Sequence, residues 1–299
     1  MATVLGFDGF GEHIAQHLGA RYARIERRVF PDSEVCPRIT HMPDEAHVIV
    51  ANRLALPLNP NSYLVETLLI VKNLADRGIE HIDVVMPYFV YGRQDKVFRE
   101  GEPFSARYVL EMLRDAGAER VFTVSSHANR NQDIVGIADI PVHNINGFVA
   151  LGSYLKGKQF REPLVIGPDK GAEGFVKTVA SAIGCDSALF EKERDLVTGD
   201  VIMKGGVTVK GRDVILVDDI IGSGGTMLKA IDLCRDAHSV YCAVVHLVSD
   251  KRVRELQEKT KEFAVANTID SPRYPSLIKV SIEALIAEKI REVSNVQGH

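Results

Sequence analysis

The chain has 299 residues, of which 45% are hydrophobic and 25% are charged, and its formal net charge is −4. This length allows two domains of ordinary size, and the composition is typical of soluble globular proteins. A weakly acidic chain lacks the broad basic surface used to bind nucleic acids, so we expect no nucleic-acid partner. No apolar run approaches the roughly 20 residues of a membrane span, so we expect no membrane partner either.

The N-terminus and the cysteines indicate a cytoplasmic protein. The first residues, MATVLGFDGF, lack the basic start and apolar core of a signal peptide. The four cysteines, Cys36, Cys185, Cys234 and Cys242, form neither a CxxC pair nor a disulfide framework. We expect Cys185, Cys234 and Cys242 to be small core residues, because their surroundings are apolar or helical.

Short apolar strands alternate with helical patterns along the chain, which predicts an α/β fold with mainly parallel sheets. The strands expected in the first half are Thr3–Phe7, His47–Ala51, Asp83–Tyr88 and Arg120–Val124. Those expected in the second half are Leu164–Gly167, Ala188–Glu191, Asp213–Val217 and Ser239–His246. Continuous apolar runs such as VILV are typical of parallel strands, which are buried on both faces.

The two halves of the chain resemble each other. The stretch LRDAGAERVFTVSSH, ending at His127, is similar to LCRDAHSVYCAVVH, ending at His246. Upstream, DVVMPYFVYGRQD and DVILVDDIIGSGG both place polar residues after an apolar run that begins with Asp-Val. A duplicated α/β domain explains both parallels, and chance similarity between two β–α units is the alternative. We expect domains at residues 1–141 and 142–299; whether the last helix, Pro275–Val293, packs back on the first domain is left open.

The most informative motif is VILVDDIIGSGGT, residues 214–226. Two carboxylates, Asp218 and Asp219, follow the apolar run and suit the vicinal hydroxyls of a ribose. A loop of small residues then enters an amphipathic helix; its members are Gly222, Ser223, Gly224, Gly225 and Thr226. The free backbone N–H groups of such a loop bind phosphate, aided by the helix dipole. The loop contains no Lys, so it is not the P-loop of nucleoside-triphosphate enzymes.

The same motif resembles the phosphoribosyl-diphosphate motif of type I phosphoribosyltransferases. The alternative is a tight β–loop–α turn without a ligand, which leaves the paired Asp218 and Asp219 unexplained.

Polar residues also follow expected strand ends in the first half, where α/β sheets present their sites. An aromatic among acidic residues in Phe30-Pro31-Asp32-Ser33-Glu34 suits a purine, although this segment alone favours an exposed turn. Arg93, Gln94 and Asp95 offer phosphate and purine partners beside two Tyr and a Phe, which favours a pocket over a solvated loop. His127 stands past a strand end and could ligate a metal or contact a phosphate, although a lone His is more often structural.

Two more segments follow strands in the second half. Asp169 could hold Mg²⁺ or a ribose hydroxyl, or simply form a Pro-Asp-Lys-Gly turn. If a strand runs on through Ala188–Arg194, Lys192 and Arg194 share one face, where an anion such as a phosphoryl group in transit relieves their repulsion. The following Asp195–Gly206, with three glycines, predicts a mobile lid. An exposed hairpin with scattered charge is the alternative.

In this order the segments resemble those of the ribose-phosphate diphosphokinases, also called phosphoribosyl-diphosphate synthetases. The similarity covers nearly the whole chain and includes PNSYLVETLLIVKNL and GEPFSARYVLEMLRDAGAERVFTV. The compact Lys192–Asp200 loop and DDIIGSGGT look closer to archaeal than to bacterial members. The resemblance implies two tandem type I phosphoribosyltransferase-like domains. It also implies Mg²⁺-dependent transfer of the β,γ-diphosphoryl group of ATP to O1 of ribose 5-phosphate, with release of AMP.

The resemblance further implies roles for individual residues. Lys192 and Arg194 would stabilise the transition state, and Arg194 would also contact ribose 5-phosphate. Asp218 and Asp219 would hold the ribose hydroxyls, while Gly222, Ser223, Gly224, Gly225 and Thr226 would bind the 5-phosphate. The ATP-binding set would be Phe30, Asp32, Ser33, Glu34, Arg93, Gln94, Asp95 and His127, and the metal ligands His127 and Asp169. In the family the loop matching Phe30–Glu34 reaches into a neighbouring subunit's site, which implies a homo-oligomer.

Three positions depart from the family pattern. Ser125-Ser126-His127 stands where Asp-x-His is usual, which removes a carboxylate from the ATP-side metal site. Ser33 replaces the Gly of FPDGE and restricts the backbone there. Gly222 replaces a more common Asp or Ser, which removes a side-chain contact. We expect an active diphosphokinase; the alternatives are a non-catalytic regulatory paralogue and a phosphoribosyltransferase. Oligomer size, cation, nucleotide preference and regulation stay open.

Overall fold

The structure is a computed structural model that describes residues 2–56, 59–126, 137–194, 201–204, 206–272 and 274–296. The chain divides into two compact units. The first comprises Met1–Ile145, Thr268–Asp270 and Ile282–His299, and the second comprises Asn146–Asn267 and Ser271–Ser281. In the described part of the chain, every helix is too short or too polar to cross a membrane.

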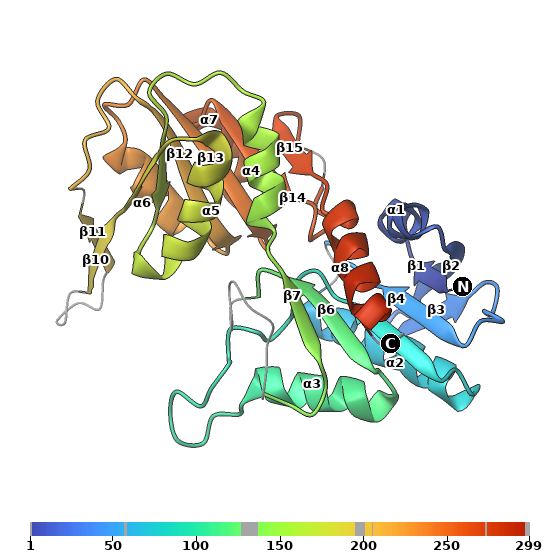
Figure 1. Ribbon diagram of the computed structural model, residues 1–299. Coiled ribbons are helices and arrows are strands. Elements are labelled where there is room, and N and C mark those ends of the chain that lie inside the picture. Colours follow the sequence, from blue (N-terminus) through green and yellow to red (C-terminus); the bar gives the residue numbers. More distant parts are fainter. Residues whose placement is uncertain are drawn as a thin grey trace. The chain divides into compact units, whose positions relative to one another are not determined.

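The first unit is built on a seven-stranded sheet with the order β3-β2-β1-β4-β5-β6-β7 (Figure 1). Its strands are β1 (Thr3–Gly6), β2 (Arg21–Val29), β3 (Val35–Ile39), β4 (His47–Ala51), β5 (His81–Val85), β6 (Arg120–Val124) and β7 (Val142–Ile145). All neighbours pair in parallel except β2 and β3, which form an antiparallel hairpin. The central strands β4, β5 and β6 are almost fully buried, because helices cover both faces of the sheet.

The helices of the first unit are α1 (Gly9–Leu18), α2 (Pro60–Asp76), α3 (Ser105–Ala116) and α8 (Glu283–Val296). Helix α8, red in Figure 1, packs on α1, and α2 packs on α3. Local chemistry fixes where α2 begins, since the Asn59 side chain accepts hydrogen bonds from the N–H groups of Asn61 and Ser62. The end of the chain therefore contributes its last helix to the first unit.

The second unit contains an entirely parallel six-stranded sheet with the order β15-β14-β13-β12-β8-β9. Its strands are β8 (Leu164–Gly167), β9 (Asp186–Leu189), β12 (Asp213–Ile221), β13 (Ser239–Leu247), β14 (Glu262–Ala266) and β15 (Leu277–Val280). Its helices are α4 (Phe148–Lys156), α5 (Glu173–Ile183), α6 (Gly225–Leu233) and α7 (Val253–Lys259), with a short 3₁₀ turn η2 (Lys170–Ala172). Helix α4 packs on α5, and α6 contacts α7 (Figure 1). A separate antiparallel hairpin consists of β10 (Glu191–Arg194) and β11 (Val201–Lys204).

The two sheets share one topology. If β8, β9, β12, β13, β14 and β15 are taken as counterparts of β1, β2, β4, β5, β6 and β7, the order of the second sheet matches that of the first. In each unit the second strand leads into an antiparallel hairpin, formed by β2 and β3 in one case and by β10 and β11 in the other. The chain therefore consists of two tandem domains of the same α/β fold.

The sequence similarity between the halves matches strands that are not counterparts in this duplicated topology. It aligned β5 with β12 and β6 with β13, whereas the topology pairs β4 with β12 and β5 with β13. The alignment was therefore wrong by one β–α unit. Consecutive parallel strands have the same buried, apolar environment, so their local sequences resemble each other without being counterparts.

Several predicted element bounds were wrong. The strand predicted at Asp83–Tyr88 ends at Val85, before Pro87, which has no N–H to donate. The strand predicted at Asp213–Val217 continues to Ile221, because β13 pairs with it as far as Leu247. The buried Phe190 separates β9 from β10, so residues 188–194 do not form one continuous strand. The helix predicted from Pro275 starts only at Glu283, and the residues of β15 precede it.

Two of the three cysteines predicted as core residues are confirmed. Cys234 and Cys242 are 1% and 2% exposed and pack in the core of the second unit. Burial raises the pKa of the Cys234 thiol to about 12, so it is inert at neutral pH. Cys185 is only half-buried.

Candidate active site

In the second unit, neighbouring parallel strands bring most of the predicted site residues to one edge of the sheet. The carboxyl ends of β9, β8, β12 and β13 lie in this order along the edge. β8 leads to Asp169, β12 leads to the loop 222–226, and β9 leads into β10, which contains Lys192 and Arg194. Ligands of α/β sheets bind outside the carboxyl ends of the strands, so this edge has the right location for a site.

Asp218 and Asp219 belong to β12 itself, instead of following it. The pairing of β12 with β8 ends at Leu216, whereas Asp218 still pairs with Val244 of β13. The backbone N–H of Asp219 donates to the Asp218 carboxylate at 2.9 Å. Asp219 is buried and Asp218 is half-buried, so the two carboxylates differ in their exposure to solvent. Both lie beyond the last residue of β12 that pairs with β8.

The loop 222–226 turns directly into α6. Gly224 is the N-cap of this helix and has a φ of 79°, a left-handed conformation that favours glycine. As a glycine, Gly224 has no side chain to cap the first turn. The N–H groups at the start of a helix have no partners within it, so the loop presents donors to an anion.

Asp169 acts as the cap of the 3₁₀ turn η2. Its Oδ1 accepts a hydrogen bond from the N–H of Gly171 at 2.9 Å. The turn packs tightly on the end of β8, where a Cβ on Gly167 would lie 2.6 Å from the Cβ of Ala172. The turn alternative is thus observed, and a metal role for Asp169 stays a prediction. Within the described ranges, no three His, Cys, Asp or Glu residues cluster as metal ligands.

Lys192 and Arg194 lie in β10, where they pair with Met203 and Val201 of β11. Residues two apart on a strand lie on the same face, so β10 is consistent with the prediction that Lys192 and Arg194 share one face. Their side chains lie outside the described part of the chain. Within the segment predicted as a lid, Val201–Lys204 forms β11, while residues 195–200 and 205 are outside the described ranges, so the lid stays a prediction.

In the first unit, β5 leads into the loop that contains Arg93, Gln94 and Asp95. The Gln94 side chain donates to the carboxylate of Glu102 at 3.1 Å, and its backbone carbonyl accepts from Ala106 at 3.1 Å. Gln94 therefore anchors the loop to the start of α3. Arg93 is exposed, whereas Asp95 is half-buried. Burial raises the pKa of the nearby Tyr88, and the charge of Arg93 opposes that shift.

The neighbouring strand β6 ends at two buried serines. Ser125 is 1% exposed and has a φ of 41°, and Ser126 is 3% exposed. The N–H of Ser126 donates to Asn144 Oδ1 at 2.9 Å, while the buried hydroxyl of Ser126 has no partner among the described residues. His127, predicted to bind metal or phosphate, lies outside the described residues.

The segment Phe30–Glu34 is the closed turn between β2 and β3. The N–H of Phe30 donates to the carbonyl of Glu34 at 2.8 Å, and the N–H of Glu34 donates to the Asp32 carboxylate at 3.1 Å. The guanidinium of Arg28 lies 4.4 Å from the centre of the Phe30 ring. Ser33 has a φ of 74°, so this position does adopt the left-handed conformation that favours glycine. The turn is ordered by its own contacts and exposes its acidic residues.

Two arginines at the carboxyl edges of the sheets were not predicted as site residues from the sequence. Arg53 follows β4 and forms an ion pair with Asp8, the N-cap of α1. Arg252 follows β13 and lies against the loop 222–226. Neither belongs to a recognisable motif, and only the topology of the sheets shows where they lie.

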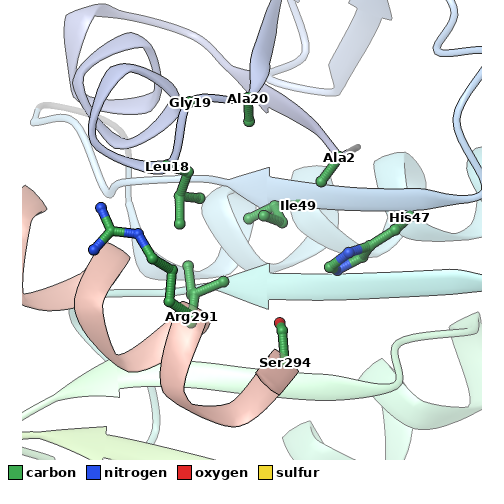
Figure 2. A pocket seen from close by; sticks show the side chains of 9 residues that line it. Ala2, Leu18, Gly19, Ala20, His47, Ile49, Arg291 and Ser294 are labelled. Atoms are coloured by element: carbon green, nitrogen blue, oxygen red, sulfur yellow. The ribbon is translucent and has the colours of Figure 1, made fainter. Parts of the chain in front are cut away.

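The pocket in Figure 2 lies at the opposite edge of the first sheet, near the amino ends of β1, β2 and β4. Its volume is about 330 Å³, and its lining residues are Ala2, Leu18, Gly19, Ala20, His47, Ile49, Ile290, Arg291 and Ser294. His47 Nε2 lies 2.8 Å from the buried carboxylate of Asp83, which also accepts two hydrogen bonds from Arg120. His47 thus belongs to a network that ties three strands together. None of the predicted site residues lines this pocket.

Comparison with known proteins identifies the family. The family model described as the N-terminal domain of ribose phosphate pyrophosphokinase matches residues 6–117, and the phosphoribosyl transferase domain matches residues 142–274. The crystal structure of phosphoribosylpyrophosphate synthetase from Mycobacterium smegmatis superimposes with a TM-score of 0.81. The two chains are 29% identical, and the alignment covers 98% of this chain and 99% of that one.

Curated relatives agree with this match. The ribose-phosphate pyrophosphokinase of Wolinella succinogenes is 35% identical, over 95% of this chain and 92% of its own. The corresponding protein of Sulfolobus acidocaldarius is 34% identical, over 93% of this chain and 96% of its own. A bacterial and an archaeal relative are thus about equally similar. This chain belongs to the ribose-phosphate pyrophosphokinase family.

Proposed function

We propose that this chain is a ribose-phosphate diphosphokinase, which transfers the β,γ-diphosphoryl group of ATP to O1 of ribose 5-phosphate and releases AMP. Family membership over nearly the full length supports this activity. The observation that carries the proposal at residue level is the pair Asp218 and Asp219, two residues before the loop 222–226, at the carboxyl edge of an all-parallel sheet. This combination suits a phosphorylated ribose.

Ribose 5-phosphate would bind to the second unit. The N–H groups of Gly222, Ser223, Gly224, Gly225 and Thr226 would hold its phosphate, where the dipole of α6 favours negative charge. The carboxylates of Asp218 and Asp219 would accept hydrogen bonds from the ribose hydroxyls. Charged acceptors make stronger hydrogen bonds than neutral ones, which helps to orient the sugar.

ATP would meet residues of the first unit. Arg93 is exposed and offers a phosphate partner, while Asp95 and the anchored Gln94 shape the loop beside it. Phe30, Asp32, Ser33 and Glu34 would contact the purine in a neighbouring copy of the chain. The exposed Asp32 and Glu34 of this turn are accessible to a second copy, as a site shared between the subunits of a homo-oligomer requires.

Mg²⁺ would neutralise the phosphates during transfer. Hard oxygen ligands suit this ion, and the carboxylate of Asp169, which follows β8, would supply one on the ribose side. On the ATP side the donor set is weaker: His127 would assist, and Ser125 offers a neutral hydroxyl in place of a carboxylate.

Lys192 and Arg194 would stabilise the charge that develops on the group in transit. Diphosphoryl transfer, like phosphoryl transfer, needs alignment and charge neutralisation more than covalent help from the protein. The anomeric hydroxyl is comparatively acidic, so the reaction does not need a strong general base. Arg194 would in addition contact ribose 5-phosphate.

Product analysis tests the proposal against its two alternatives. ATP carrying isotopic labels in the β- and γ-phosphates should yield AMP and phosphoribosyl diphosphate that holds both labels. A phosphoribosyltransferase would instead consume phosphoribosyl diphosphate and release pyrophosphate. A regulatory paralogue would bind ribose 5-phosphate without forming AMP.

A further inference from the structure

Arg252 covers the glycines of the small-residue loop. A Cβ on Gly224 would lie 3.2 Å from the Cβ and 3.5 Å from the Cδ of Arg252. A Cβ on Gly225 would lie 3.9 Å from the Nη1 of the same guanidinium. The arginine side chain thus runs along the loop at the point where α6 begins.

The topology brings Arg252 to this place. β13 is the parallel neighbour of β12, so the segments that follow these two strands meet at one edge of the sheet. Local hydrogen bonds order the segment after β13. The hydroxyl of Tyr274 donates to Asp250 at 2.9 Å, and the Arg252 carbonyl accepts from the N–H of Leu256 at 3.0 Å. Arg252 is the N-cap residue of α7 and is therefore fixed at the backbone.

The charge of Arg252 has no counterpart in the described part of the chain. The guanidinium is exposed, and no described carboxylate forms an ion pair with it; the nearby Asp250 is bound to Tyr274 instead. A cation beside the amino end of a helix is unfavourable, because that end already carries partial positive charge. An anion bound in the loop would turn this repulsion into attraction to both groups.

We propose that Arg252 is a further binding residue for the phosphate of ribose 5-phosphate, acting together with the N–H groups of the loop 222–226. This inference rests on the proposed function of that loop. A guanidinium presents paired N–H donors that match phosphate oxygens, which an ammonium group does not. The first unit has a similar arrangement, since Arg93 follows β5, the counterpart of β13 in the shared topology.

The test compares Arg252→Met with Arg254→Met. Methionine keeps most of the aliphatic packing on Gly224 and removes the charge, and Arg254 is an equally exposed arginine two residues further along. Arg252→Met should raise both the KM and the calorimetric Kd for ribose 5-phosphate by about 10- to 100-fold. The kcat and the KM for ATP should change less than about twofold. Arg254→Met should leave all four quantities unchanged, and Arg252→Lys should recover part of the affinity.

The outcomes separate the inference from the function on which it rests. If Arg252→Met binds ribose 5-phosphate as tightly as the unmodified protein, Arg252 only packs on the loop and the inference is wrong. An equal loss for ATP and the sugar phosphate, with a lower Tm, would also overturn it, because that pattern indicates a structural role. If the unmodified protein itself fails to bind ribose 5-phosphate, the proposed function fails first.

Discussion

The fully buried carboxylate of Glu66 accepts two hydrogen bonds from the guanidinium of Arg27, each 2.7 Å long. Glu66 lies on α2 and Arg27 on β2, so the pair ties the helix to the strand that leads into the Phe30–Glu34 turn. The same guanidinium stacks 4.3 Å from the centre of the Phe7 ring. One ion pair thus fixes the base of a segment proposed to bind ATP.

Removing the arginine should destabilise the first unit strongly. Arg27→Met leaves the charge of Glu66 buried without a partner, and we expect the free energy of unfolding to fall by about 3–5 kcal/mol. Urea unfolding measures this loss. The matched control is Arg38→Met, which breaks an exposed pair with Glu26 and should cost less than about 1 kcal/mol. Similar losses in both variants would contradict the role assigned to the buried pair.

Ser33 holds a backbone conformation that suits glycine better. Its φ of 74° lies in the left-handed region, which disfavours an L-residue by about 1–2 kcal/mol. The greater freedom of glycine in the unfolded chain cancels about 0.5–1 kcal/mol of the relief. We therefore expect Ser33→Gly to raise the free energy of unfolding by about 0.5–1 kcal/mol and Ser33→Val to lower it. A glycine variant less stable than the serine protein would contradict the assigned backbone conformation.

Asp213 should make the stability of the second unit depend on pH. Burial alone would raise the pKa of this carboxyl, but hydrogen bonds from the N–H of Arg161 and from His238, both 2.8 Å long, outweigh it and lower the pKa below 3.8. A lowered pKa stabilises the fold above the unfolded-state value, and this contribution is lost as the pH falls through the folded-state value.

Asp213→Asn should therefore lower the free energy of unfolding at pH 7 by about 1–3 kcal/mol. It should also flatten the decline in stability between about pH 5 and pH 2. Denaturant unfolding over this pH range measures both effects. Asp236→Asn is the control, since Asp236 is exposed and its side chain forms no hydrogen bond or ion pair with any residue that the structure describes. If the free energy of unfolding of Asp213→Asn falls as steeply with decreasing pH as that of the unmodified protein, Asp213 is not the source of the pH dependence.

Lys192→Ala should separate transition-state stabilisation from binding. If Lys192 acts on the group in transit, kcat should fall by about 100-fold or more while the Kd for ribose 5-phosphate stays nearly constant. Single-turnover kinetics and calorimetry measure the two quantities. Lys210→Ala removes the same charge from an exposed position and should leave both unchanged. An equal loss of turnover and affinity would assign Lys192 to ground-state binding instead.

The sequence predicted the central strands well, because the burial of these strands is visible in their own residues. Runs such as Val214–Val217 are apolar at every position, as a strand buried on both faces requires. By contrast, β2 (RYARIERRV) is mostly charged and partly exposed, so its pairing with β1 and β3 left no apolar pattern. Proline is a common first residue of helices, so Pro275 led to the prediction of a helix where β15 lies before α8.

The candidate site was predictable where a motif is continuous in the chain. Only Ile220 and Ile221 separate the paired carboxylates from the loop 222–226, and the fold places both at one sheet edge. Arg252 was not predictable, because its proximity to Gly224 depends on β13 lying beside β12. The turn at Asp169 was one of the alternatives that the sequence left open, and the hydrogen bond from the N–H of Gly171 shows it, while the metal role of Asp169 stays a prediction.

The most direct test of the central claim is AMP formation from ATP, with and without ribose 5-phosphate, at saturating Mg²⁺. The proposed activity predicts AMP only when the sugar phosphate is present, which would also show that Ser125 is compatible with a working metal site. Absence of AMP under these conditions, and equally with Mn²⁺ and added phosphate, would contradict the account and indicate a protein that binds ribose 5-phosphate without catalysis.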